Sequence, residues 1–369
     1  MEVVSFDRLT NDQLHTWERI RATRPEFSTP FFSARFSSIV HTVRGDVEVA
    51  VIRASDGPGN PIVGFLPFNR LGKIAYPVGR CLNDAHNIIA TNQVKIDWLW
   101  LLDQIDVKAY DFHAMVGADL DDLAGDNYVG TVRSFCSELG DDSEAFLKRL
   151  AKQHRTIQKQ GQKTRKMIRE IGPVELEIDC RDSELMKQTI QWKRNQYQRT
   201  DILDFFSANW TRGLVTGLHE ETGFHIGTAD EIPGTTRGYL SVLRAGGNVV
   251  AAHYGMIEND LLHYWYPAYD PKYSIYSPGT ALFTAIVAAA SENGIRCIDM
   301  GYGEQPYKLK QTDTTSIVGF GSLSRSKFHL NRRRWEATAR EAIKKAPMKG
   351  TLKRIRQRVL PGVGRSKLK

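Results

Sequence analysis

The sequence has few cysteines and no long apolar segment, and these two absences exclude several classes of protein. Its 369 residues include only four cysteines, which stand far apart without a CxxC pair. This spacing predicts reduced thiols, with neither a disulfide framework nor a zinc site. The longest nearly apolar run, Thr280–Ala290, is well short of the ~18 residues that a membrane span needs. Acidic residues close to Met1 argue against a secretory signal, so we expect a cytoplasmic protein.

Motifs of several common catalytic sites are also missing. The sequence contains no HExxH, no carboxylate-rich calcium loop and no GxxxxGK[ST] phosphate-binding loop. We therefore expect neither a bound metal ion nor ATP hydrolysis. A GxSxG nucleophile elbow is absent as well, so no sequence motif indicates a covalent acyl-enzyme intermediate.

Positive charge is concentrated at the C-terminal end. Residues 325–369 contain 16 Lys and Arg against two glutamates, a surplus of 14. Because the whole chain carries +8, subtracting this surplus leaves −6 on the other residues. We predict a basic helical tail over 331–369, with helices at Trp335–Lys345 and Leu352–Leu360. Such a tail either lies on an anionic membrane surface, binds nucleic acid, or is solvated.

The two halves of the chain show the same predicted order: two helices, three strands, a helix and a strand. In the first half the helices are 10–22 and 30–43, the strands 47–54, 62–69 and one near 74, and then a helix over 94–104 and a strand over 109–115. In the second half the helices are 183–198 and 205–219, the strands 238–244, 249–257 and 261–266, and then a helix over 280–292 and a strand over 295–300.

This repeated order predicts a mixed α/β protein with two tandem domains, residues 1–142 and 173–330. Each is expected to be a mostly antiparallel mixed sheet flanked by helices. A basic helix over 143–172 joins them, capped near Asp142 or Ser143. Its charged side chains either face solvent or guide an anionic substrate.

The junction Ser277-Pro278-Gly279 stands between an aromatic strand and an alanine-rich helix. The first amides of a helix have no internal partners and carry partial positive charge, so a phosphate group binds well there. Gly279 and Ala281 leave the backbone uncovered, and Thr280 adds a hydroxyl. The same residues also make an ordinary turn and cap, so the pattern by itself leaves both interpretations open.

Three strands followed by this helix and a further strand resemble the core of the GNAT acyltransferase superfamily. In that superfamily the pyrophosphate of acyl-coenzyme A binds the loop that opens the helix, in the pattern Gln/Arg-x-x-Gly-x-Gly/Ala. Here the positions are Tyr276, Ser277, Pro278, Gly279, Thr280 and Ala281. The Gly-x-Ala end matches, whereas Tyr276 replaces the Gln or Arg. The first half has no such glycine, so the resemblance implies that it is a degenerate domain without a cofactor.

Four segments in the second half carry a closer resemblance. WKRNQY, GNVVAAHYG, YPAYDPKYSIYSPGTAL and IDMGYGEQPYKLK follow one another in this order. Together they resemble the CelD-type acetyltransferase domain of exopolysaccharide biosynthesis, and the layout is similar to the double-GNAT Fem-type aminoacyltransferases. The resemblance implies direct attack of an acceptor on the thioester of acetyl-CoA or of a longer acyl-CoA.

Five residues in or next to these segments are candidates for the chemistry that acyl transfer needs. Asp299 is a base or substrate anchor, or else a cap for the following turn, and Glu304 is a second candidate base. Tyr307 has the chemistry to protonate the departing sulfur, and Lys308 to stabilise oxyanion or phosphate charge. His253 has small neighbours on its strand and faces either a ligand or the core.

Candidate acceptor-binding residues lie on the helix over 183–198, which the resemblance places beside the acceptor, and at the end of the strand over 261–266. They are Trp192, Lys193, Gln196, Tyr197, Tyr266, Tyr269 and Asp270. Tyrosine rings stack on sugars, although tyrosines at a strand end are also ordinary packing residues. The resemblance implies acylation of an amino group, or of a hydroxyl, on a sugar or lipid-linked saccharide that is a cell-envelope or exopolysaccharide precursor. A transferase using aminoacyl-tRNA and a non-catalytic scaffold are the alternatives, and the oligomeric state is left open.

Overall fold

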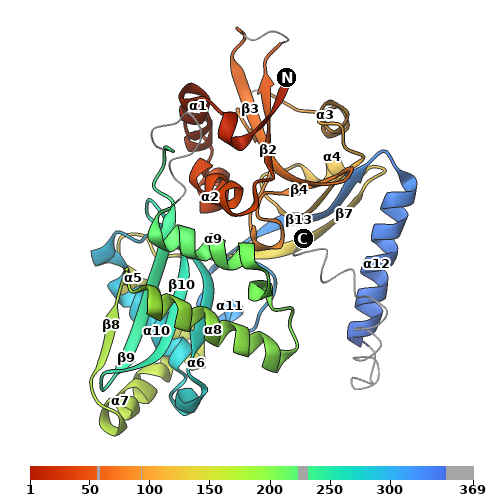
Figure 1. The fold of residues 1–369 in the computed structure, drawn as a ribbon. Helices are drawn as coiled ribbons and strands as arrows, with labels where there is room; N and C mark the ends of the chain where they lie inside the picture. Colours follow the sequence, from red (N-terminus) through yellow and green to blue (C-terminus); the bar gives the residue numbers. More distant parts are fainter. Residues whose placement is uncertain (56–58, 93, 223–231, 346–369) are drawn as a thin grey trace.

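A single mixed sheet runs through both halves of the chain (Figure 1). The computed structural model describes residues 1–55, 59–92, 94–222 and 232–345, and in these residues the sheet has 13 strands. Their order is β1-β2-β3-β4-β6-β13-β7-β12-β11-β10-β9-β8, with β5 paired to β3. This confirms the predicted fold class of a mixed, mostly antiparallel sheet flanked by helices.

The first half contains the elements β1 (Glu2–Ser5), α1 (Asn11–Ala22), α2 (Ala34–Arg44), β2 (Val47–Arg53), β3 (Ile62–Leu71), β4 (Ile74–Pro77), β5 (Ile89–Ala90), α3 (Trp98–Gln104), β6 (Ala109–Met115), α4 (Leu120–Ala124) and β7 (Tyr128–Glu138). The predicted order is confirmed, but two helices begin later than expected. Ser33 caps α2 after a 3-10 turn over Pro30–Phe32, and Asp97 caps α3 through the amides of Leu99 and Trp100. In both cases a capping side chain, rather than the apolar pattern, sets the start.

The basic linker was predicted as one helix over 143–172, and this was wrong. It consists of α5 (Ser143–Gln153), α6 (Arg155–Gln158) and α7 (Gln160–Glu170). The helix breaks at His154, whose backbone is extended (φ −126°, ψ 108°). Asp142 caps α5 by accepting a hydrogen bond from the amide of Ala145.

The second half contains β8 (Val174–Glu177), α8 (Ser183–Thr200), α9 (Asn209–Glu220), β9 (Arg237–Ala245), β10 (Asn248–Glu258), β11 (Leu261–Tyr269), α10 (Pro278–Ala290), β12 (Cys297–Tyr302), α11 (Lys308–Gln311), β13 (Thr314–Ser324) and α12 (Lys327–Lys345). The order of its helices and strands is again as predicted. The predicted tail helix at Trp335–Lys345 is the end of α12, and Leu352–Leu360 lies outside the described residues. A membrane-crossing helix is not found in the described ranges, because each helix there is too short or too polar.

The two halves exchange their last strands. β7, from the first half, pairs antiparallel with β12, whereas β13, from the second half, lies between β6 and β7. Neither β7 nor β13 was predicted from the sequence. Because each strand hydrogen-bonds to the other half, the two predicted domains share one sheet.

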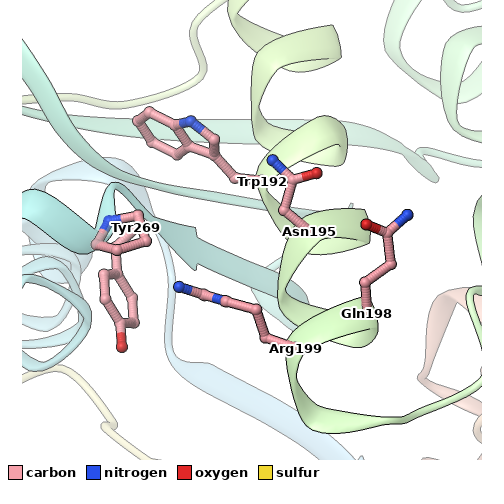
Figure 2. Close-up of a pocket in the computed structure, with 6 residues that line it drawn as sticks. Trp192, Asn195, Gln198, Arg199 and Tyr269 are labelled. Carbon is pink, nitrogen blue, oxygen red and sulfur yellow. The ribbon is translucent and has the colours of Figure 1, made fainter.

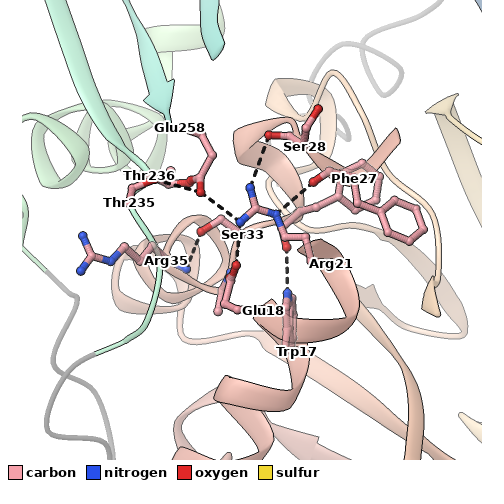
Figure 3. A network of polar contacts seen from close by, with 12 residues as sticks. Trp17, Glu18, Arg21, Phe27, Ser28, Ser33, Arg35, Thr235, Thr236 and Glu258 are labelled. Carbon is pink, nitrogen blue, oxygen red and sulfur yellow. Dashed lines mark hydrogen bonds and ion pairs between the residues drawn. The ribbon is translucent and has the colours of Figure 1, made fainter. Parts of the chain in front are cut away.

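A buried ionic network also joins the halves (Figure 3). The Arg21 guanidinium of α1 lies 2.6 Å from the Glu18 carboxylate and 3.1 Å from Glu258 at the end of β10. It also donates to the carbonyls of Phe27 and Ser28. Burial raises the pKa of Glu18, although Arg21 opposes this shift. Such a network fixes α1 relative to β10, because Glu258 is buried and Glu18 is largely buried, so both carboxylates depend on Arg21 for stabilisation of their charge.

The strands β11 and β12 separate after a short paired segment, and the candidate active site lies at this separation. These parallel strands pair only over Leu261–His263 and Cys297–Asp299. Beyond His263, the side of β11 that faces β12 has no strand partner among the described residues. On its other side β11 pairs with β10, with one extra β11 residue opposite Gly255. The sheet therefore opens into a gap between its central strands.

Candidate active site

A pocket of about 430 Å³ lies between the C-terminal part of α8 and the end of β11 (Figure 2). It is lined by Trp192, Asn195, Gln198, Arg199, Tyr269 and Pro271. Trp192, Asn195 and Arg199 share one side of α8 because their spacing follows the helical period. Of the predicted acceptor-binding residues, Trp192 and Tyr269 line this pocket. Asn195, Gln198 and Arg199 were not predicted, although the positions of Asn195 and Arg199, three and seven residues after Trp192, place them on the same side of the helix.

The N-terminus of α10 lies directly beside this pocket. A Cβ atom added to Gly279 would lie 3.7 Å from Cδ1 of Tyr269. The Gly279 amide donates no hydrogen bond within the described residues, whereas the amides of Thr280 and Ala281 both donate to the Ser277 carbonyl at 3.0 Å. The predicted anion site therefore offers one open amide rather than a row of them.

Lys163 of α7 adds positive charge to this helix terminus. Its Nζ donates to Oγ of Ser277 at 2.6 Å, and Ser277 has left-handed backbone geometry (φ +53°). Tyr276 points away, since its hydroxyl donates to Glu170 at 2.8 Å and its ring is buried. Lys163 thus supplies a cation beside the loop whose sequence has Tyr276 in place of Gln or Arg. The sequence did not single out Lys163. It predicted only that the charged side chains of the basic linker either face solvent or guide an anionic substrate.

A buried histidine lies between two carboxylates at the point where β11 and β12 separate. The Nδ1 atom of His263 is 2.8 Å from Asp299, and Nε2 is 3.4 Å from Asp84. Burial lowers the pKa of His263, but the hydrogen bonds and charges of Asp299 and Asp84 outweigh it and raise the pKa to about 9. His263 is therefore a cation at neutral pH. Its partner Asp299 pairs with this cation and also accepts a hydrogen bond from the Gly301 amide, so of the predicted roles (base, substrate anchor or cap of the following turn) these contacts are those of the cap.

Asp84 reaches this histidine from a loop of the first half, and the sequence did not indicate it. Gly301 makes room, since a Cβ there would lie 2.6 Å from the Asp84 carboxylate. Its φ of +67° also favours glycine, and its amide donates to Asp299 at 2.9 Å.

Two buried lysines lie near the same gap. Lys308 Nζ donates to the carbonyls of Gly301 (3.1 Å) and Tyr302 (2.7 Å), and burial lowers its pKa. Lys193 Nζ donates to the Pro267 carbonyl at 3.1 Å and lies over the ring of Tyr197. Burial, reinforced by the charge of Lys308, lowers the pKa of Lys193 to about 8. Two predicted residues thus concentrate positive charge here.

His253 stacks on Tyr264 with ring centroids 4.0 Å apart and planes nearly parallel. Burial lowers the pKa of His253, and the charges of His263 and Lys193 lower it further. The imidazole is therefore neutral, and neither of its nitrogens has a hydrogen-bond partner within the described residues. The buried hydroxyls of Tyr264 and Tyr266 are also without partners there. Unpaired buried polar atoms are uncommon, and three of the side chains that carry them, His253, Tyr264 and Tyr266, lie on neighbouring strands β10 and β11.

The remaining predicted residues lie at different depths. Tyr307 is half-buried at the start of α11, and burial raises the pKa of its phenol. Glu304 is exposed and paired with Arg133 at 2.7 Å, away from the buried cluster. Asp270 caps the turn after β11 through the amide of Lys272, and Gln196 is half-buried on α8.

The chain is similar to several known proteins. Residues 151–309 match the family model described as acetyltransferase (GNAT) domain. This part of the chain is similar to GNAT acetyltransferase domains. The structure of FemX is similar at 12% identity, covering 91% of this chain and 99% of FemX, with a TM-score of 0.55. A tandem GNAT protein from the clavulanic acid biosynthesis pathway matches at 11% identity, 76% and 83% coverage and a TM-score of 0.40. No curated protein matches the sequence.

Proposed function

We propose that this protein is an N-acyltransferase that moves an acyl group from acyl-CoA to an amino group of a sugar or other cell-envelope or exopolysaccharide precursor. A hydroxyl acceptor would react by the same route. The observation that carries the proposal is the gap between β11 and β12, with buried ionisable groups at its end and an open helix terminus beside it. The match of residues 151–309 to the GNAT acetyltransferase domain supports an acyltransferase.

The residues present fit an acyl-CoA donor. Lys163, the Ser277 hydroxyl and the Gly279 amide offer a cation and two neutral groups to a diphosphate. The unpaired edge of β11 offers backbone groups to the amide-containing arm of the donor, as a sheet edge does to an added strand. When bound, the donor supplies the reactive thioester, and this chain positions it and holds the protons.

Three side chains are candidates for the proton transfers and charge stabilisation that direct attack requires. The acceptor nitrogen forms a bond to the acyl carbon, the carbon–sulfur bond breaks, and the amine loses one proton. Neutral His253 is the candidate to take that proton, since neither of its nitrogens has a hydrogen-bond partner in the part of the chain that the structure describes. Tyr307 keeps its proton at neutral pH and is the candidate to give it to the leaving thiolate. Lys308 stabilises the negative charge that develops on the acyl oxygen.

The pocket beside α8 suits a carbohydrate acceptor. Trp192 and Tyr269 offer aromatic surfaces, while Asn195, Gln198 and Arg199 offer side chains that hydrogen-bond hydroxyl groups (Figure 2). This combination supports a saccharide of the kind that CelD-type proteins are expected to modify.

The basic tail supports a peripheral position on the cytoplasmic face of the membrane. On α12, Phe328 and Trp335 are 81% and 65% exposed. They are seven residues apart and so lie on the same side of the helix. With a charge surplus of 14 over residues 325–369, this face has the composition of helices that bind anionic lipid surfaces. Such docking would bring the site to lipid-linked acceptors.

Binding of the donor tests the proposal, in a thermal-shift titration with acetyl-CoA and a longer acyl-CoA. The wild type should be stabilised as RT ln(1 + [L]/Kd). Gly279→Glu places a carboxylate at the helix terminus and should abolish the shift, whereas Ala288→Glu puts the same charge on an exposed position of α10 and should keep it. Equal responses of the two variants would refute the site. If the protein binds aminoacyl-tRNA in a salt-sensitive way and does not respond to acyl-CoA, the donor is aminoacyl-tRNA instead.

A further inference from the structure

Two cysteines that are 161 residues apart in sequence meet on the face of the sheet that carries Asp299. Cys136 lies on β7 and Cys297 on β12, and their sulfurs are 2.7 Å apart. Oε1 of Glu138 is 3.4 Å from the Cys136 sulfur and 4.0 Å from the Cys297 sulfur. All three ligand atoms lie within 4.8 Å of one another.

Strand register explains the cluster. In the antiparallel pair of β7 and β12, Glu138 lies directly opposite Cys297, and Cys136 lies directly opposite Asp299. Residues two apart on a strand point to the same face, so all four side chains share one face. Asp299 is already occupied by His263 and the Gly301 amide. Two thiols and one carboxylate are left at the other three corners.

We propose that Cys136, Cys297 and Glu138 form a binding site for a zinc-class divalent cation. Two sulfurs and one carboxylate oxygen are a donor set that Zn²⁺ accepts in tetrahedral coordination, with the fourth position left to water. The cysteines are half-buried and Glu138 is exposed, so an ion can reach the site from solvent. Glu138 forms no ion pair with a cationic side chain in the described part of the chain, and it is therefore available as a ligand.

The same register disfavours a disulfide as the function of this pair. Cys136 and Cys297 are diagonal neighbours, and the Cα atoms of such neighbours are ~7–8 Å apart. Disulfides need Cα atoms within about 6.8 Å. Two thiolates bound to one tetrahedral ion at about 2.3 Å lie about 3.7 Å apart, so the two cysteine side chains would rotate apart by about 1 Å to bind it. The ion would also link β7 of the first half to β12 of the second, next to Asp299.

Zinc binding can be measured on the full chain independently of any activity. The chelator-treated protein is titrated with Zn²⁺ against a chromophoric chelator, and with Co²⁺ to observe thiolate-to-metal charge transfer. We expect one ion per chain, a thiolate band with Co²⁺ and a higher melting temperature with Zn²⁺. Cys136→Ser and Cys297→Ser should lose the band and tight binding, Glu138→Gln should bind more weakly, and Cys180→Ser should behave as the wild type.

Three results would overturn the proposal. The first is wild-type zinc binding no tighter than that of the Cys136→Ser/Cys297→Ser double variant. The second is a Cys136–Cys297 disulfide in the non-reduced protein purified from cells. The third is a Glu138→Gln variant that binds zinc as tightly as the wild type does. Because Glu138 is exposed, this variant is expected to fold, and so it still tests the proposal if a serine variant fails to fold.

Discussion

The His263 environment makes stability depend on pH in a predictable direction. The ordinary pKa of histidine is 6.5, and in the folded protein Asp299 and Asp84 raise that of His263 to about 9. A raised pKa means that the folded state holds a proton which the unfolded chain releases above pH 6.5. The stabilisation is therefore complete below pH 6.5 and is lost as the pH rises through about 9.

The size of the stability loss follows from the difference between the pKa values of His263 in the unfolded and folded states. Each pH unit between the two pKa values changes the free energy of unfolding by about 1.4 kcal/mol. From pH 6.5 to 8 we therefore expect a loss of about 2 kcal/mol. Above pH 8 a second group opposes this loss: burial lowers the pKa of Lys193 from 10.5 to about 8, so its deprotonation favours the folded state as pH rises. Burial also lowers the pKa of His86, His219 and His253, and these histidines oppose the loss at the lower end of the range, so comparison with a variant that lacks the Asp299 charge isolates His263.

Urea denaturation at closely spaced pH values measures this loss. Asp299→Asn removes the main partner charge and should flatten the dependence between pH 6.5 and 8. Asp103→Asn, which removes an exposed carboxylate paired with Arg325, should keep the wild-type slope. In Lys193→Met the decline should continue to about pH 9. An Asp299→Asn variant whose stability depends on pH between 6.5 and 8 as the wild type's does would refute the reasoning.

Three further outcomes follow from the same structure. Arg21→Met leaves two buried carboxylates uncompensated and should cost about 3–5 kcal/mol in denaturant unfolding, whereas a loss below 1 kcal/mol, as expected for exposed Arg19→Met, would contradict the network's role. Gly255→Ala would place Cβ 2.1 Å from the His263 carbonyl oxygen and should cost at least about 1–3 kcal/mol in the same assay; an unchanged stability would contradict the bulge geometry. Trp335→Ser should weaken sedimentation with anionic vesicles but not alter the weak binding to zwitterionic ones, and unchanged anionic binding would remove α12 from the membrane proposal.

Much of the fold could be predicted because its signals are local. The helix and strand order of both halves follows from apolar periodicity, caps such as Thr10, and turns such as Gly246-Gly247. β7 and β13 were not predicted, because their side chains are mostly polar and partly exposed over much of their length. Their pairing with the opposite half depends on contacts between distant segments, which local periodicity does not encode.

The candidate site likewise contains residues that the sequence indicates and residues that only the tertiary fold brings together. Gly279, Lys193, His253 and Lys308 stand in recognisable segments, and the structure places the last three among buried groups near the gap. Asp84 and Lys163 come from other segments and reach the site only through the tertiary fold. The sequence-based exclusion of a zinc site considered spacing along the chain, whereas Cys136 and Cys297 become neighbours through strand pairing.

Acyl transfer itself is tested most directly by following free thiol released from acetyl-CoA in the presence of amino sugars. The proposed function predicts that thiol appears in step with an N-acetylated product, confirmed by mass spectrometry, and that N-acetylated sugars do not serve as acceptors. Tyr307→Phe should slow the reaction by roughly 10²–10⁴-fold while acyl-CoA still shifts the melting temperature. Thiol release that does not depend on any acceptor, or full activity in Tyr307→Phe, would contradict the assigned chemistry.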